Sequence, residues 1–242
     1  RNFGINNAKN NYIAFIDADD FWEKDFLSEI VYLIKKYPYC GMYSTGFNYV
    51  INDSAKKNKS GIIGDCVIDN YFKQSLKHRI VNSSNVVIRN SILEKVGGFP
   101  VGMIAAEDLY TWAKVASVSK LAYSDKTLSS YNLDSEGWRL RKDKKDIDGY
   151  SYTQLLDGEP YKTDYLSLLA YEKAIYYLIN GFKQEAEKQI APFIRSNPFG
   201  INMIKYQFYR LFSKKIIFRL VMLEKSVVRK INLFQELIIS KI

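Results

Sequence analysis

The sequence predicts an α/β fold, with a sheet flanked by helices and an α-helical C-terminal extension. Three observations lead to this prediction. Short apolar runs rich in β-branched and aromatic residues, the first at 12–16, are typical of buried strands. Segments with apolar residues at helical spacing separate these runs. From residue 163 to the end of the chain, only the helical pattern remains.

The first part of the chain alternates between helix and strand. The expected elements are a helix, a strand, a helix, a strand and a polar loop, at residues 1–10, 12–16, 23–36, 40–51 and 52–64. The second helix is expected to end before Pro38, because the residue before a proline avoids the helical conformation.

The alternation continues to about residue 135. We expect a short helix, a strand, a short helix, a longer helix and one or two strands, at residues 66–77, 86–88, 91–96, 107–117 and 121–131. Gly97 and Gly98 follow the second short helix, and glycine commonly ends a helix in the left-handed conformation.

The C-terminal part differs in composition. Polar residues 133–160 predict a loop or linker, and the helical pattern beyond them is interrupted at Pro192 and at Asn197-Pro198. We therefore divide the chain into a core at 1–135, a polar linker at 136–162 and a helical region at 163–242.

Three carboxylates lie close together at residues 17–20, with the sequence D-A-D-D, directly after the first strand. Such groups repel one another and resist desolvation, so a fold keeps them where a cation neutralises them. Mg²⁺ and Mn²⁺ bind carboxylate oxygens and leave positions for substrate phosphates. The residues alone leave two interpretations open: a metal-bridged nucleotide site, or an acidic turn that caps the helix beginning near Glu23.

Two sequence blocks resemble the nucleotide-sugar-binding core of family 2 glycosyltransferases, which have the GT-A fold. The first runs from Arg1-Asn2-Phe3-Gly4 to the D-A-D-D cluster and is similar to the family pattern A-R-N-x-G followed by D-x-D-D. The second is Gly97-Gly98-Phe99 followed by Glu107-Asp108, similar to the family's G-G-F and E-D. The resemblance covers about residues 1–135 and indicates a GT-A core there.

The resemblance implies a metal-dependent, inverting transferase that moves a sugar from a nucleoside-diphosphate donor, a UDP-sugar above all, to an acceptor hydroxyl. The acceptor would be a glycan or a lipid-linked molecule, in bacterial cell-surface polysaccharide or glycoconjugate synthesis. Asp19 and Asp20 would hold Mn²⁺ or Mg²⁺. The residues implied to bind the nucleotide sugar are Arg1, Asn2, Asp17, Asp19, Asp20 and Glu107.

Asp108 would be the general base that accepts the proton of the acceptor hydroxyl. Simple capping of a helix N-terminus is the alternative explanation for the acidic pair at 107–108. Trp138, Arg139 and Arg141 lie where related enzymes have a loop that closes over the diphosphate. A solvated charged linker would also explain these three residues.

Two other function classes stay open. In a non-catalytic relative, the domain would bind a sugar or a protein partner. This alternative gains support because the strand and turn with which family members begin are absent before Arg1, so we expect the N-terminal strands of the sheet to be missing. The retained carboxylates argue against it. A nucleotidyltransferase would need a glycine-rich, basic phosphate loop, which the sequence does not contain.

Charge and cysteine content indicate partners and compartment. Nine basic and only two acidic residues follow position 200, in a chain of net charge +9. Basic amphipathic helices bind anionic lipid, so we expect peripheral contact with the inner face of the plasma membrane; a solvated face of a helical bundle is the alternative. The chain lacks a recognised nucleic-acid motif, so no nucleic-acid partner is expected. Two cysteines without metal-ligand spacing suit the cytoplasm.

Overall fold

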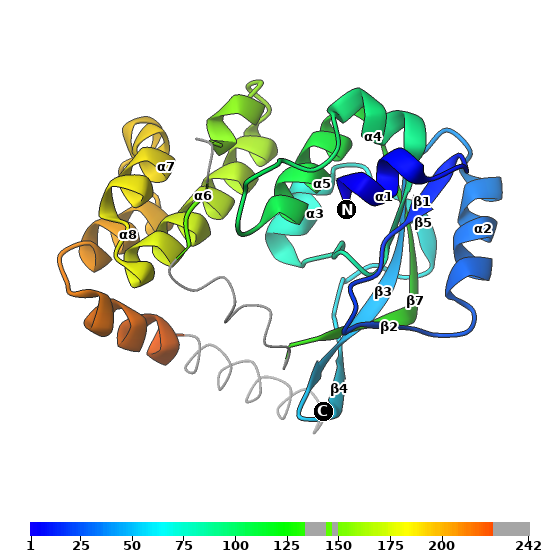
Figure 1. Cartoon of the computed structure of the whole chain (residues 1–242), viewed down its shortest axis with the longest axis horizontal. Helices are drawn as coiled ribbons and strands as arrows, with labels where there is room; N and C mark the ends of the chain where they lie inside the picture. Colours follow the sequence, from blue (N-terminus) through cyan, green and yellow to red (C-terminus); the bar gives the residue numbers. More distant parts are fainter. Residues whose placement is uncertain (134–143, 147–149, 225–242) are drawn as a thin grey trace. The chain divides into compact units, whose positions relative to one another are not determined.

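The computed structural model describes residues 1–133, 144–146 and 150–224. The chain divides into two compact units, one of residues 1–142 and 146–169, the other of residues 143–145 and 170–242. The first, the sheet unit, is built around a β-sheet with helices on both faces, and the second, the helical unit, consists of helices (Figure 1). This architecture confirms the α/β fold with a helical extension. The boundaries at 135 and 162 stay predictions.

The sheet has seven strands in the described part of the chain, in the order β1-β6-β3-β7-β2, with β4 paired to β3 and β5 paired to β7. It is a mixed sheet, because β3 and β7 run parallel while the other pairs are antiparallel. The strand bounds are β1 Tyr12–Ala14, β2 Phe21–Trp22, β3 Met42–Ile51, β4 Ser54–Lys57, β5 Asp65–Val67, β6 Val86–Arg89 and β7 Leu121–Asn132.

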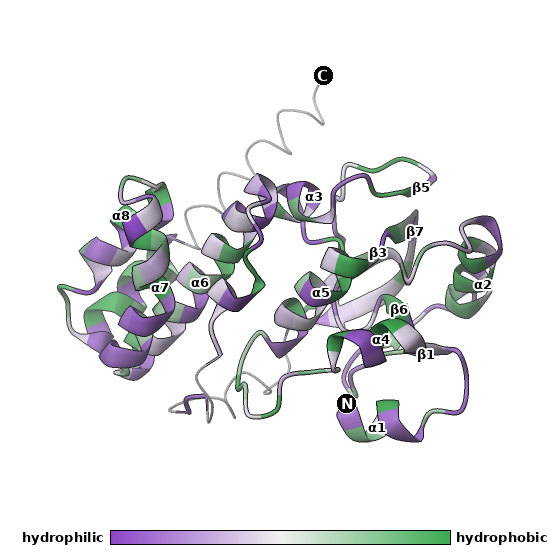
Figure 2. Ribbon diagram, turned by 90° about the horizontal axis from the view of Figure 1, so that it is seen from above, coloured by the Kyte–Doolittle hydropathy of each residue, from purple (hydrophilic) through white to green (hydrophobic). Residues whose placement is uncertain are grey.

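Helices cover both faces of this sheet. Helix α2 lies on one face, and α3, α4 and α5 lie on the other (Figures 1 and 2). The helices of the sheet unit are α1 Asn2–Asn7, α2 Phe26–Lys36, α3 Tyr71–Lys77, α4 Asn90–Val96 and α5 Glu107–Val118, and the 3₁₀ helix η2 spans Tyr152–Leu155. The two helical layers bury the apolar side chains of both sheet faces.

Each face has its own apolar core. Under α2, the buried residues are Phe26, Ile30, Leu33, Cys40, Tyr43, Val87 and Ala122. On the α5 side, the rings of Phe15, Phe99 and Trp112 pack with centroid separations of 5.4 to 5.8 Å. Phe15 lies between β1 and the acidic cluster, so this aromatic contact anchors the chain immediately before Asp17.

The predicted loop at 52–64 was wrong in part, because it contains strand β4. Asn52 and Asp53 have φ angles of 47° and 58° and form a two-residue connection between β3 and β4. Turns of this left-handed kind match the twist of antiparallel strands, and Asn and Asp tolerate them. The four residues of β4 are exposed, so the strand has no apolar alternation that the sequence could show.

The predicted helix at 66–77 begins later than expected. Residues 65–67 form β5, and helix α3 starts only at Tyr71. The start is set by Asn70, whose side chain accepts a hydrogen bond of 2.9 Å from the backbone N–H of Lys73. By contrast, α4 ends as predicted: Gly97 is left-handed with φ 73°.

The helical unit contains α7 Lys183–Ser196, α8 Ile201–Tyr209, and a helix at residues 214–224. Helix α6, Pro160–Asn180, begins in the sheet unit and ends here. Among the described residues, no helix combines the length and apolarity needed to cross a membrane.

The break predicted at Pro192 was wrong, since this proline lies inside α7. Proline removes one helical hydrogen bond, but the buried neighbours Ile190 and Phe193 hold the helix against the unit's core. The chain instead turns at Gly181, with φ 86°, between α6 and α7. The predicted break at Asn197-Pro198 is confirmed, because α7 ends at Ser196.

Candidate functional site

Asn2 connects α1 to the loop that follows α4. Its Nδ2 donates to the carbonyl of Phe99 at 2.8 Å, and the Phe99 N–H donates to Asn2 Oδ1 at 2.9 Å. Gly98 has φ 63°, and a Cβ there would lie 2.7 Å from Asn2 Oδ1. A residue other than glycine would therefore disturb this contact. These contacts place Asn2, and Arg1 before it, next to the second sequence block. The role of Asn2 as a nucleotide ligand stays a prediction.

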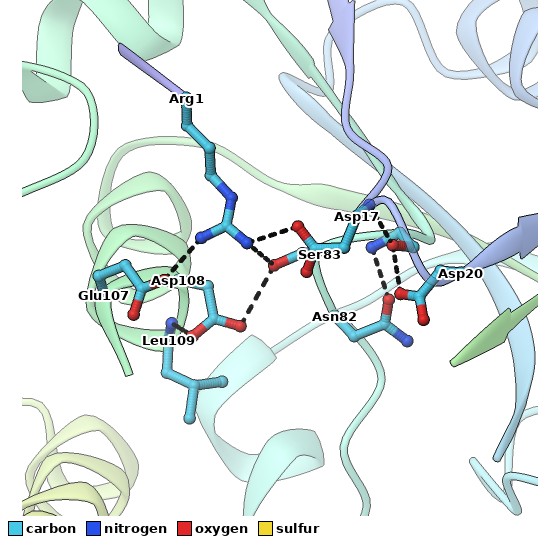
Figure 3. A network of polar contacts seen from close by, with 9 residues as sticks. Arg1, Asp17, Asp20, Asn82, Ser83, Glu107, Asp108 and Leu109 are labelled. Atoms are coloured by element: carbon cyan, nitrogen blue, oxygen red, sulfur yellow. Dashed lines mark hydrogen bonds and ion pairs between the residues drawn. The ribbon is translucent and has the colours of Figure 1, made fainter. Parts of the chain in front are cut away.

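Arg1 joins the two predicted acidic segments (Figure 3). Its Nη2 lies 2.6 Å from Asp17 Oδ1, and its Nη1 lies 2.7 Å from Glu107 Oε1. Nη2 also donates to Ser83 Oγ at 3.2 Å. Burial lowers the pKa of Arg1, but the hydrogen bond and charge of Asp17 and the charges of Glu107 and Asp108 raise it overall. The guanidinium therefore stays charged and holds the carboxylates together.

Asp108 lies in the first turn of α5, next to this ion-pair network. Its Oδ2 accepts a hydrogen bond of 3.4 Å from Ser83 Oγ, and its Oδ1 accepts one of 2.8 Å from the N–H of Leu109. The preceding helix cap, Ala106, has φ 61°, a left-handed conformation that is uncommon for a residue with a Cβ. Ser83 thus links Arg1 to Asp108.

Asp20 is in a different environment, with only 6% of its surface exposed. Its Oδ2 accepts a hydrogen bond of 2.5 Å from Ser84 Oγ, and its Oδ1 accepts one of 2.8 Å from the N–H of Asn132. Burial raises the pKa of Asp20, these two hydrogen bonds oppose the rise, and the charges of Asp19 and Asp17 add to it. Asp20 therefore ties the acidic cluster to the end of β7.

The adjacent serines 83 and 84 bind different carboxylates, Asp108 and Asp20 respectively. Ser84 is fully buried, and its Oγ also accepts a hydrogen bond of 2.9 Å from the N–H of Asp17. Sequence reasoning did not include the serines among the site residues. A usable signal was present, because the polar run Asn82-Ser83-Ser84-Asn85 directly precedes an apolar strand.

Asp19 lies between these two networks in the chain and is partly exposed. It forms no hydrogen bond or ion pair with another residue in the described part of the chain. That part also contains no group of three or more His, Cys, Asp or Glu side chains that could enclose a metal. Mg²⁺ and Mn²⁺ sites can depend on one or two carboxylates and the substrate's phosphates, so the donor set at Asp19 and Asp20 fits such a metal.

Apart from Asn2, which pairs with Phe99, the predicted residues form two groups and leave one side chain outside both. Arg1, Asp17, Glu107 and Asp108 meet around Ser83, and Asp20 joins Ser84. Asp19 stands apart. Trp138, Arg139 and Arg141 lie outside the described residues.

The first part of the chain matches a known protein family. Residues 1–97 match the family model described as "Glycosyl transferase family 2". This stretch of the chain is therefore similar to glycosyltransferase family 2. The family 2 match contains Arg1, the acidic cluster and both serines, and it ends at the first glycine of the G-G-F block.

Curated proteins that are similar to this chain come from bacteria. Glycosyltransferase GlyA of Streptococcus pneumoniae is 29% identical over 146 residues, which cover 55% of this chain and 20% of GlyA. TuaG of Bacillus subtilis, a putative teichuronic acid biosynthesis glycosyltransferase, is 25% identical over 150 residues, covering 59% of this chain and 56% of TuaG. The chain thus spans between about a fifth and about half of the curated relatives it matches. The crystal structure of S. aureus TarS 1-349 aligns with a TM-score of 0.46 at 15% identity, covering 87% of this chain and 57% of that one.

Proposed function

We propose that this protein transfers a sugar from a nucleoside-diphosphate sugar to a hydroxyl group, with inversion at the anomeric carbon. The observation that carries the proposal is the bridge of Arg1 between Asp17 and Glu107, which lie 16 and 106 positions away in the sequence. This bridge unites the two sequence blocks in one site. The match of residues 1–97 to the family 2 model and the similarity to proteins described as glycosyltransferases support the same activity.

On the donor side, we assign the nucleotide sugar to the acidic cluster and to the Arg1 network. The proposed donor is a UDP-sugar. Asp19, together with Asp20, would hold Mn²⁺ or Mg²⁺, which would neutralise the negative charge of the leaving diphosphate. Asp20 is already fixed by two hydrogen bonds, so Asp19 supplies the uncommitted carboxylate. Arg1 fixes Asp17 and Glu107 at the edge of this site.

On the acceptor side, Asp108 is the proposed general base. The acceptor oxygen forms its bond to the anomeric carbon while the bond from that carbon to the diphosphate breaks. The acceptor proton moves to the carboxylate of Asp108. The hydrogen bond from Ser83 orients this carboxylate before the reaction.

The proposed acceptor is a glycan or a lipid-linked molecule in bacterial cell-surface polysaccharide or glycoconjugate synthesis. The description of TuaG as a teichuronic acid biosynthesis enzyme supports this class. The proposed location is the cytoplasm, with peripheral contact between the basic C-terminal helices and the inner face of the plasma membrane. The charge of these helices supports that contact.

Calorimetric titration with UDP, with and without Mn²⁺, tests the donor site. We expect Mn²⁺-dependent binding that weakens at least about tenfold in Asp19→Asn, because this change removes the uncommitted carboxylate. Asp69→Asn is the matched control, because Asp69 is an exposed aspartate outside the site. Unchanged UDP affinity in Asp19→Asn would overturn the metal assignment.

Two further outcomes separate the alternatives. Failure of the unaltered protein to bind UDP under either condition would count against a UDP-sugar donor. Metal-dependent UDP binding without turnover of any UDP-sugar in a donor screen would favour the non-catalytic binding module.

A further inference from the structure

The helix at residues 214–224 exposes an unusual amount of apolar surface. Ile217 and Val221 are buried and attach the helix to its unit. Leu220 is partly buried, while four other apolar side chains of this helix are between 44% and 62% exposed: Ile216, Phe218, Met222 and Leu223. We call these four residues, together with Lys215 and Arg219, the C-terminal face. Residues four apart are neighbours on a helix, so Lys215 lies beside Arg219, and Phe218 lies beside Met222.

Helix α8, which precedes this helix, shows a similar feature. Met203 and Tyr206 are buried, while three apolar side chains of the helix are between 48% and 67% exposed: Ile201, Ile204 and Phe208. Leu211, in the turn that follows, is 75% exposed. Figure 2 shows apolar and polar residues mixed along α8. A helix in contact with water on one side normally carries polar residues there, so these exposed stripes suggest a contact with something other than water.

The charge of this region is one-sided. Residues 201–223 contain five basic side chains and no acidic one. Lys205 pairs with Glu224. Arg210 lies 3.3 Å from Glu187. The other three basic residues form no ion pair within the part of the chain that the structure describes: Lys214, Lys215 and Arg219.

We propose that the C-terminal face binds an anionic membrane surface. Its apolar side chains would enter the boundary between headgroups and acyl chains, and its cations would contact lipid phosphates. The charge argues against a second copy of this chain as the occupant, because two such faces would place like charges opposite one another. The inference deepens the proposed function, in which the acceptor can be lipid-linked, but the binding itself requires no catalysis.

Co-sedimentation of the full chain with lipid vesicles tests this surface. We expect binding to vesicles of phosphatidylcholine with 30% phosphatidylglycerol, little binding to phosphatidylcholine alone, and weaker binding as salt rises. Neutralising two cations in Lys215→Gln/Arg219→Gln should lower the partition coefficient by about fivefold for each charge removed. Phe218→Ser/Met222→Ser should also weaken binding, because less apolar surface enters the bilayer.

Matched controls come from helix α2 in the sheet unit. Leu27 and Val31 are 52% and 47% exposed there, so Leu27→Ser/Val31→Ser removes similar apolar surface from another helix. Lys35→Gln/Lys95→Gln removes two exposed cations from the ends of α2 and α4. These controls should leave vesicle binding unchanged. Circular dichroism of every variant checks that the fold is retained.

Three results would overturn the proposal: no vesicle binding by the unaltered protein, equal binding to neutral and anionic vesicles, or binding that the face variants and the controls change equally. Concentration-dependent dimers in sedimentation that Phe218→Ser/Met222→Ser abolishes, without vesicle binding, would instead identify an interface between copies. UDP titration of the same variants keeps the two proposals apart, since vesicle binding can fail while nucleotide binding persists.

Discussion

Asp17 and Asp20 lie three residues apart in one turn, yet the structure places them in opposite environments. The Asp17 side chain is 34% exposed and pairs with the charged Arg1. Asp20 is buried and accepts hydrogen bonds from a serine hydroxyl and a backbone N–H, and no ion pair joins it to any of the described residues. The same residue type therefore connects two motifs by charge in one case and holds two chain segments together in the other.

The difference between Asp17 and Asp20 shows that the carboxylates of one acidic motif can have different roles. The buried, hydrogen-bonded carboxylate of Asp20 is the one whose loss should cost stability, while the carboxylate of Asp19 should matter for binding. Stability and nucleotide binding should therefore respond to different substitutions within the same four residues.

The largest effect on stability is expected for Asp20→Ala. This substitution leaves the Ser84 hydroxyl and the Asn132 N–H without their acceptor in a buried site, which should lower the free energy of unfolding by about 3 kcal/mol. Urea denaturation measures the change. Asp19→Ala is the control and should stay within about 0.5 kcal/mol of the unaltered protein, because Asp19 is partly exposed. Equal losses of unfolding free energy in Asp20→Ala and Asp19→Ala would contradict the proposed difference between these two carboxylates.

The adjacent serines offer a second, smaller test. Ser84→Ala should cost about 2 kcal/mol, because the hydroxyl serves both Asp20 and the N–H of Asp17 in a buried position. Ser83→Ala should cost less than about 1 kcal/mol, since its hydrogen bonds to Arg1 and Asp108 are longer, at 3.2 and 3.4 Å. Urea denaturation of the pair gives the comparison. A larger loss from Ser83→Ala would show that the Arg1 network carries more of the stability.

The smallest expected effect is a pH dependence that belongs to Asp20. Because folding raises the pKa of Asp20, the folded state favours its protonated form. This contribution to stability is fully present below the unfolded pKa of about 3.9 and is lost as the pH rises through the folded pKa. Asp20→Asn cannot ionise, so between pH 4 and pH 7 the unaltered protein should lose more unfolding free energy than this variant. Parallel urea curves at both pH values test this, and identical losses would contradict the raised pKa.

The sequence by itself determined the elements whose signals are local. Helix α5, the end of α2 before Pro38 and the Gly97 end of α4 lie where apolar periodicity, a proline or a glycine predicted them. The predicted buried strand at 12–16 was wrong in part, because β1 ends at Ala14 and its three residues are not buried. The two acidic blocks were also visible, because each follows or begins an element with a clear pattern. Family resemblance then implied that the blocks belong to one site, and the bridge through Arg1 agrees.

Only the tertiary structure decided the roles within the site. The partners of Asp20 are Ser84 and Asn132, 64 and 112 positions away, and no periodicity records contacts over such separations. The same limit explains the errors at β4 and Pro192. An exposed edge strand has no apolar pattern, and packing of Ile190 and Phe193 outweighs the local tendency of proline to end a helix. Local physics set where the elements form, and long-range burial and hydrogen bonding set what each carboxylate does.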